Sequence, residues 1–89
     1  MADAANALAR VIQHLVDEPS AVRVREVARG RQQILEVEVA AEDMGSVIGR
    51  GGRTAQALRA LLRQRGDAQG ISYDLKIREQ GDDSEREPR

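Results

Sequence analysis

The chain has 89 residues, 40% of them hydrophobic, and a formal net charge of -1 at pH 7, so it can build one small core but not a second. Cysteine is absent, which excludes a disulfide framework and a thiol metal site. No apolar run is long enough to cross a membrane and the amino terminus lacks a signal-peptide pattern, so we expect a cytoplasmic protein with no membrane partner.

An amphipathic helix is predicted near the amino terminus. The segment Asp17-Glu18-Pro19 ends this helix. Its apolar stripe indicates a packing role, because the apolar residues recur at helical spacing at Leu8, Val11, Ile12, Leu15 and Val16.

Two strands joined by a turn are predicted next. Valines indicate a short strand over residues 22–27, and Arg29-Gly30-Arg31 provides the turn. In a second strand, residues 35–39, aliphatic residues alternate with Glu36 and Glu38. We interpret the two glutamates as protection of a sheet edge against aggregation and not as an acid/base pair.

The segment from Val47 to Leu62 places Gly-Arg-Gly-Gly between two short apolar-periodic stretches. This pattern predicts a helix, a bare loop and a second helix that begins near Arg53. Glycine at positions 49 and 52 lets the backbone of a ligand approach closely. The unpaired N–H groups and the dipole of the second helix favour an anion at the same point. We expect a phosphodiester backbone as the ligand and not a single phosphate, because no other segment of the sequence shows a nucleotide-binding pattern.

A third strand is predicted over residues 71–78, where Ile71, Tyr73, Leu75 and Ile77 alternate with polar residues. The element order is then helix, strand, strand, helix, helix, strand. It predicts an α+β domain of two layers, with helices on one face of a three-stranded sheet. The hairpin is antiparallel and the helical crossover makes the last strand parallel, so the sheet is mixed. The strand order stays open.

The domain is expected to span residues 1–78, followed by a disordered acidic tail over 79–89. The tail has five acidic and two basic residues and no hydrophobic anchor. Without it, 12 basic residues face 10 acidic ones. A domain charge near +2 is compatible with RNA as a partner.

The loop and its flanks resemble the signature of KH domains, in which such a loop clamps about four nucleotides. The wording E-D-M-G-S-V-I-G-R-G-G-R is similar to small single-domain bacterial KH proteins of the KhpA type, with a resemblance that covers residues 2–78. The element order corresponds to the type II KH arrangement. The resemblance implies single-stranded RNA binding and a role as an RNA chaperone or post-transcriptional regulator linked to cell growth and division. It also implies pairing with itself or with a second, larger KH-domain protein.

The expected RNA-binding residues serve the phosphates or the bases. The loop backbone holds phosphates, and Arg50 and Arg53 add positive charge. The KH resemblance places bases over a groove floored by Val47, Ile48 and Leu58 and bordered by the segment from Ile34 to Val37. Thr54 and Ala55 depart from the larger aliphatic residues of many KH sequences. The full set is Val47, Ile48, Gly49, Arg50, Gly51, Gly52, Arg53, Thr54 and Leu58.

Two other functions compete with RNA binding. A nucleotide-binding enzyme is disfavoured because no Gly-Lys-Ser/Thr follows the loop and no nucleophile and base suggest themselves; we expect no catalytic residue, cofactor or metal. RRM and OB modules need aromatic platforms, and Tyr73 is the one aromatic residue. A protein-interaction module with a KH fold and little RNA binding stays open.

The helix after the loop has a wide apolar surface at Ala57, Leu58, Ala60, Leu61 and Leu62, which predicts a homodimer.

Overall fold

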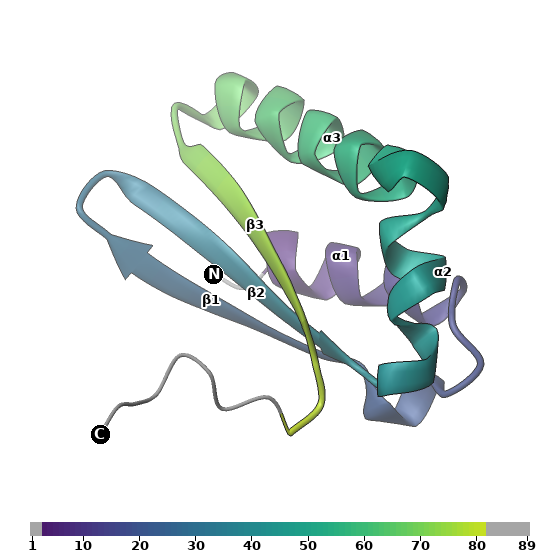
Figure 1. The fold of residues 1–89 in the computed structure, drawn as a ribbon. Helices are drawn as coiled ribbons and strands as arrows, with labels where there is room; N and C mark the ends of the chain where they lie inside the picture. The colour runs from purple at the N-terminus through teal and green to yellow at the C-terminus, as the bar shows by residue number, and fades with distance from the viewer. Residues whose placement is uncertain (1–2, 82–89) are drawn as a thin grey trace, which may run out of the picture.

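The structure is a computed structural model and describes residues 3–81 (Figure 1). The helices are α1 (Asp3–Gln13), α2 (Met44–Ile48) and α3 (Arg53–Gln69), and the strands are β1 (Arg23–Arg29), β2 (Gln32–Val39) and β3 (Ser72–Glu79). Short 3₁₀ turns cover Pro19–Ala21, Ala41–Asp43 and Arg50–Gly52. The predicted order of helix, strand, strand, helix, helix, strand is confirmed.

The sheet has the strand order β1-β2-β3. β1 and β2 are antiparallel, and their register pairs Arg29 with Gln32 across the turn. Gly30 supplies the positive φ of 60° that this tight turn requires. β2 and β3 are parallel, because α2 and α3 carry the chain back before β3 begins. The predicted mixed sheet is therefore confirmed, and the structure adds that β2 lies in the centre.

One face of the sheet packs against the helices and forms the core. The side chains of Leu35, Val37 and Val39 on β2 are fully buried, as the alternation predicts. The helices contribute Leu8, Ile12, Val47, Leu58 and Leu62 to the same cluster. Burying a side chain of this size is worth about 1.5–3 kcal/mol. The layer of helices over one sheet face confirms the predicted two-layer α+β fold (Figure 1).

The predicted stripe of the first helix is only partly buried. α1 ends at Gln13, and two i to i+3 hydrogen bonds, from His14 N–H and Leu15 N–H, tighten the chain after it. Val11 and Leu15 remain 44% and 39% exposed. The buried face of α1 lies instead along Ala4, Ala5, Leu8 and Ile12, because the small alanines let the helix approach the core closely.

The central place of β2 corrects two expectations. Both edges of β2 are hydrogen-bonded, so the segment from Ile34 to Val37 has no free edge that could border a groove. For the same reason Glu36 and Glu38 cannot protect a sheet edge. They lie on the face of the sheet opposite the core, each between basic residues of the neighbouring strands.

β3 continues through Glu79, and the N–H of Gln80 donates a hydrogen bond of 2.7 Å to the carbonyl of Val39. Regular pairing thus extends past Arg78, where the sequence places the end of the domain. Most of the predicted tail, residues 82–89, lies outside the described residues.

Asp43 holds the amino-terminal half of the fold to α2. Its side chain is 1% exposed, and its two carboxylate oxygens each accept a hydrogen bond of 3.0 Å, from Asp17 N–H and Glu18 N–H. The carboxylate therefore satisfies two backbone donors of the turn that follows α1.

Replacing Asp43→Asn is expected to destabilise the domain by about 1–3 kcal/mol, because the amide nitrogen cannot accept one of these bonds. For a domain of this size the loss lowers the melting temperature by about 5–15 °C, which thermal unfolding followed by circular dichroism would measure. Glu42→Gln, at an exposed neighbouring position, is the control. Equal melting temperatures for both variants would contradict the role of Asp43.

Candidate functional site

The loop of residues 49–52 joins α2 to α3 through three glycines with positive φ. Gly49 has φ 81° and ψ 167°, and Gly51 and Gly52 are in the left-handed region at φ 65° and 78°. Side chains other than glycine rarely adopt these angles. Arg50 is the one residue of the loop that carries a side chain, so the remaining surface of the loop is bare backbone.

Gly49 is also required by space. A Cβ at this position would overlap the hydroxyl of Thr54 and lie 2.7 Å from the nitrogen of Thr54. Thr54 is half-buried and packs against the backbone of Gly49. A small residue at position 54 therefore lets the first turn of α3 pack closely against the loop.

The backbone of the loop forms a short 3₁₀ turn that leads into α3. Gly52 N–H bonds the carbonyl of Gly49 at 3.0 Å, and Arg53 N–H bonds the carbonyl of Arg50. Arg50 and Gly51 begin this 3₁₀ turn, so their N–H groups have no partner within it. These groups lie at the amino-terminal end of α3, a helix of 17 residues whose dipole favours negative charge there.

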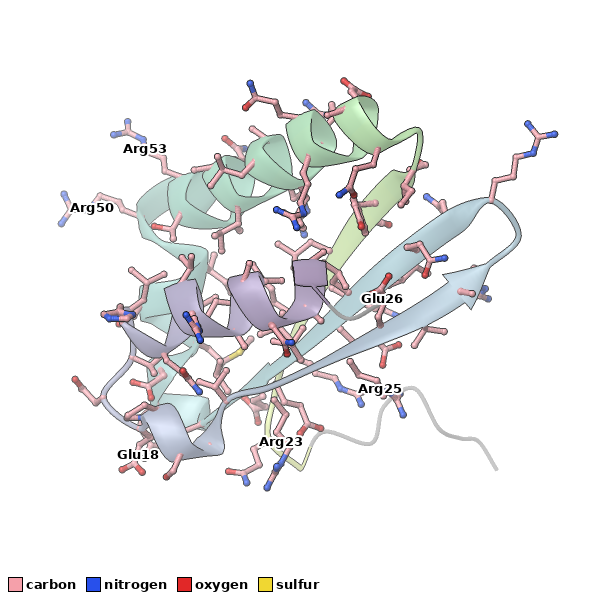
Figure 2. The ribbon with its side chains drawn as sticks, turned by 180° about the vertical axis from the view of Figure 1, so that it is seen from behind. Glu18, Arg23, Arg25, Glu26, Arg50 and Arg53 are labelled. Carbon is pink, nitrogen blue, oxygen red and sulfur yellow. The ribbon has the colours of Figure 1, made fainter. Side chains whose placement is uncertain are left out.

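Arg50 and Arg53 extend outward from the loop on the same side of the molecule (Figure 2). Both are exposed. Neither guanidinium has a hydrogen bond or ion pair with another residue in the described part of the chain. Two uncompensated positive charges therefore stand beside the N–H groups that begin the 3₁₀ turn, an arrangement that suits the oxygens of successive phosphates.

The three apolar residues of the predicted groove floor differ in exposure. Val47 is fully buried and Leu58 is 4% exposed, so both support the loop from within the core. Ile48 is 38% exposed and directly precedes Gly49. The structure thus brings together Ile48, the loop, Arg53 and Thr54. Of the three predicted floor residues, Ile48 alone is exposed to a ligand.

The free strand edge beside α3 belongs to β3, which the sequence could not reveal. Arg59 of α3 donates a hydrogen bond of 3.4 Å to the carbonyl of Leu75, and Leu75 N–H bonds the carboxylate of Asp74 at 2.8 Å. These side chains cap the middle of the β3 edge, which reduces its tendency to pair with another strand.

An apolar groove lies between α1 and α3. It has a volume of about 200 Å³ and is lined by Ala4, Ala7, Val11, Leu58, Leu61 and Arg65, among others. Leu61 is 59% exposed, the highest value for a large apolar side chain among residues 4–81. The Nε of Arg65 is buried and has no hydrogen-bond partner among the described residues. The wide apolar surface expected on α3 is therefore shared with α1.

Within residues 3–81, no group of three or more histidine and acidic side chains could hold a metal ion. None of the helices in this range combines the length and apolar character that a membrane span needs.

Comparison with known proteins gives a consistent result. The family model of the KhpA/KhpB KH domain matches residues 5–77. The chain is 45% identical over 71 residues to the RNA-binding protein KhpA of Leifsonia xyli, a match that covers 80% of this chain and 93% of that protein. It is 40% identical over 73 residues to RNA-binding protein KhpA of Chlamydia pneumoniae, with 82% and 94% coverage. With RNA-binding protein KhpA of Mycobacterium leprae, it shares 46% identity over 70 residues, with 79% and 86% coverage.

Proposed function

Because the chain belongs to the KhpA/KhpB family of KH domains, we propose that it binds single-stranded RNA through the loop of residues 49–52. The observation that carries the proposal is the bare glycine loop, whose 3₁₀ turn begins with the N–H groups of Arg50 and Gly51, flanked by two uncompensated arginines. The relatives named RNA-binding protein KhpA support RNA as the ligand.

In this proposal, phosphates rest on the backbone of Gly49, Arg50, Gly51 and Gly52, and Arg50 and Arg53 neutralise them. Bases lie over Ile48, while Val47 and Leu58 hold that surface in place from below. The free edge of β3 replaces the edge of β2 as the far border of the groove, since β2 is paired on both sides. Thr54 acts through the loop by keeping Gly49 in its close contact.

A footprint of about four nucleotides gives weak binding, and a second linked domain raises the affinity without new contacts. The apolar groove between α1 and α3 supports self-association as the source of that second site. A larger KH-domain protein is the alternative occupant. In either case a hydrogen-bond acceptor on the occupant would satisfy the buried Nε of Arg65, which lines the groove.

The cellular role that fits these properties is that of a cytoplasmic RNA chaperone or post-transcriptional regulator, which the family resemblance links to cell growth and division. A protein-interaction module with little RNA binding is the competing function. The exposed apolar groove supports it, and a loop that does not bind RNA would decide in its favour.

The affinity for single-stranded RNA is expected to fall with salt, with a slope of about -1.5 to -3 in a plot of log affinity against log salt, because two to four phosphates are neutralised. Fluorescence anisotropy with a labelled RNA between 50 and 200 mM salt, roughly the range over which such effects are measured, would give the slope. Duplex RNA of the same composition should bind more weakly, since the groove receives unstacked bases. A preference for the duplex would count against the proposal.

A further inference from the structure

A second basic surface lies on the face of the sheet that is opposite the helices. In the strand register Arg23, Glu38 and Arg78 form one row across the three strands, and the next row is Arg25, Glu36 and Lys76. We call these six residues the outer sheet face. They carry four positive and two negative charges, a net charge of +2.

At Arg25 and Glu36 the charges are layered, with the carboxylate below and the guanidinium above. Arg25 donates two hydrogen bonds, of 2.6 and 3.2 Å, to one oxygen of Glu36, yet its side chain is 69% exposed while that of Glu36 is 15% exposed. These hydrogen bonds hold the pKa of the Glu36 carboxyl below its ordinary value. The Glu36 carboxylate therefore stays ionised and orients Arg25, which an approaching ligand meets first. The side chain of Arg78 lies deeper, at 20% exposed against 28% for its partner Glu38.

Arg23 adds positive charge that the face does not compensate. Its side chain is exposed and forms no hydrogen bond or ion pair with the residues from 3 to 81. It stands two residues before Arg25 on an edge strand, so the two Cα atoms are about 7 Å apart. Between them and Arg78 lies an open hollow of about 440 Å³, lined also by Val24, Glu36 and Glu38.

The chemistry of the face fits a nucleic-acid backbone better than a protein. Stable protein interfaces are anchored by large apolar or aromatic side chains and are depleted of charge at their centre. The two rows of the outer sheet face hold only charged residues. Nucleic-acid interfaces are polar and positively charged, and arginine forks match phosphate oxygens.

We propose that the outer sheet face is a second binding surface for the phosphodiester backbone of single-stranded RNA. Arg23 and Arg25 extend from a part of the molecule remote from Arg50 and Arg53 (Figure 2). One molecule then holds two RNA segments at once, one at the loop and one on the sheet, and brings complementary strands together. A dimer formed through α1 and α3 leaves this face open in both copies, because those helices cover the other side of the sheet.

The test separates the two surfaces by NMR. A mixed-sequence RNA hexamer is titrated into the protein while backbone amide shifts are recorded. The unmodified chain should show two groups of shifting amides, one around residues 49–54 and one around the outer sheet face. With Arg50→Asp and Gly51→Asp together, only the sheet group should persist. If the amide shifts of the sheet do not change at millimolar RNA in this variant, the second surface is overturned. If the amides of residues 49–54 do not shift in the unmodified chain, the proposed function is overturned.

Variants that change one charge test whether the outer sheet face itself controls the affinity for RNA. Arg23→Glu should weaken hexamer binding at the sheet about 10-fold, Arg23→Gln less, and Glu38→Gln should strengthen it. Arg10→Glu, with the same change of charge at an exposed position of α1, should leave the sheet shifts unchanged. If Arg10→Glu and Arg23→Glu weaken binding equally, the effect is one of net charge and the surface assignment is wrong. Poly-glutamate that shifts the sheet amides at lower concentration than the RNA would also overturn it, in favour of an acidic protein.

Annealing of complementary RNA strands gives a second readout of the proposed surface. The unmodified protein should speed the annealing of two complementary 20-nucleotide RNAs that carry a fluorescence donor and acceptor, at roughly the moderate salt where phosphate contacts persist. Arg23→Glu should reduce this acceleration several-fold while the loop amides still respond to RNA. An annealing rate that is unaffected by Arg23→Glu would refute the bridging of two strands.

Discussion

RNA binding is expected to fall by about 100-fold or more when Arg50→Asp and Gly51→Asp are combined. The double variant removes one positive charge and places two carboxylates where the phosphates are proposed to lie. At a partly solvated surface, each like-charge contact near 4 Å costs about 1–4 kcal/mol, and 1.4 kcal/mol corresponds to a factor of ten. Fluorescence anisotropy with single-stranded RNA would measure the loss.

The control for this variant is Arg50→Gln with Gly51→Asn, which has similar size and backbone demands but no added negative charge. Position 51 has φ 65°, where Asp and Asn are tolerated at modest cost, and a Cβ there meets no atom within 4 Å. Both variants should therefore melt within a few degrees of the unmodified chain. If the Asp variant binds RNA as tightly as the control, phosphates do not lie at the loop and the protein-interaction function gains support.

The strands were predictable because their pattern is local. Alternation of aliphatic and charged residues along β2 assigns Leu35 and Val37 to the core and Glu36 to the other face, whatever the neighbouring strands are. Strand order is not local: the side chains of Glu36 and Glu38 look the same on a central strand and on an edge strand. The interpretation of these glutamates as edge protection was wrong for that reason.

Residues that act across the fold were not predictable from spacing. Asp43 looks like an exposed residue before a helix, and its burial depends on the turn at Asp17 and Glu18, some 25 residues away in sequence. Gly66 looks like a weak helix position. In the structure a Cβ there would overlap the carbonyl of Ile71, so Gly66 lets α3 pack directly against the start of β3.

The loop was predictable in position and partly in detail. Three glycines within four residues indicate backbone angles that other residues avoid, and Gly49, Gly51 and Gly52 all have positive φ. The exposure of the flanking apolar residues was not predictable, since it depends on how α2 and α3 pack on the sheet. Val47 and Leu58 face the core, and Ile48, adjacent in sequence to Val47, faces outward.

Leu61→Arg is expected to convert a homodimer into a folded monomer. Leu61 is 59% exposed on the groove between α1 and α3, and stable interfaces usually depend on a few apolar side chains near their centre. In a two-fold dimer the substitution brings two arginines into one apolar contact, which costs far more than the loss of a leucine. Light scattering coupled to gel filtration would show the mass fall from that of a dimer to that of a monomer.

Folding and the loop itself should survive this change, because Leu61 is not part of the buried core. Affinity for an RNA long enough to reach two copies should drop at least 10-fold, since the second site no longer acts at high effective concentration. Affinity for a tetranucleotide should stay the same. Gln64→Arg, which adds the same charge at an exposed position of α3 outside the groove, is the matched control and should remain dimeric. A monomeric mass for the unmodified chain at several hundred micromolar would refute self-association and leave a different KH-domain protein as the occupant of the groove.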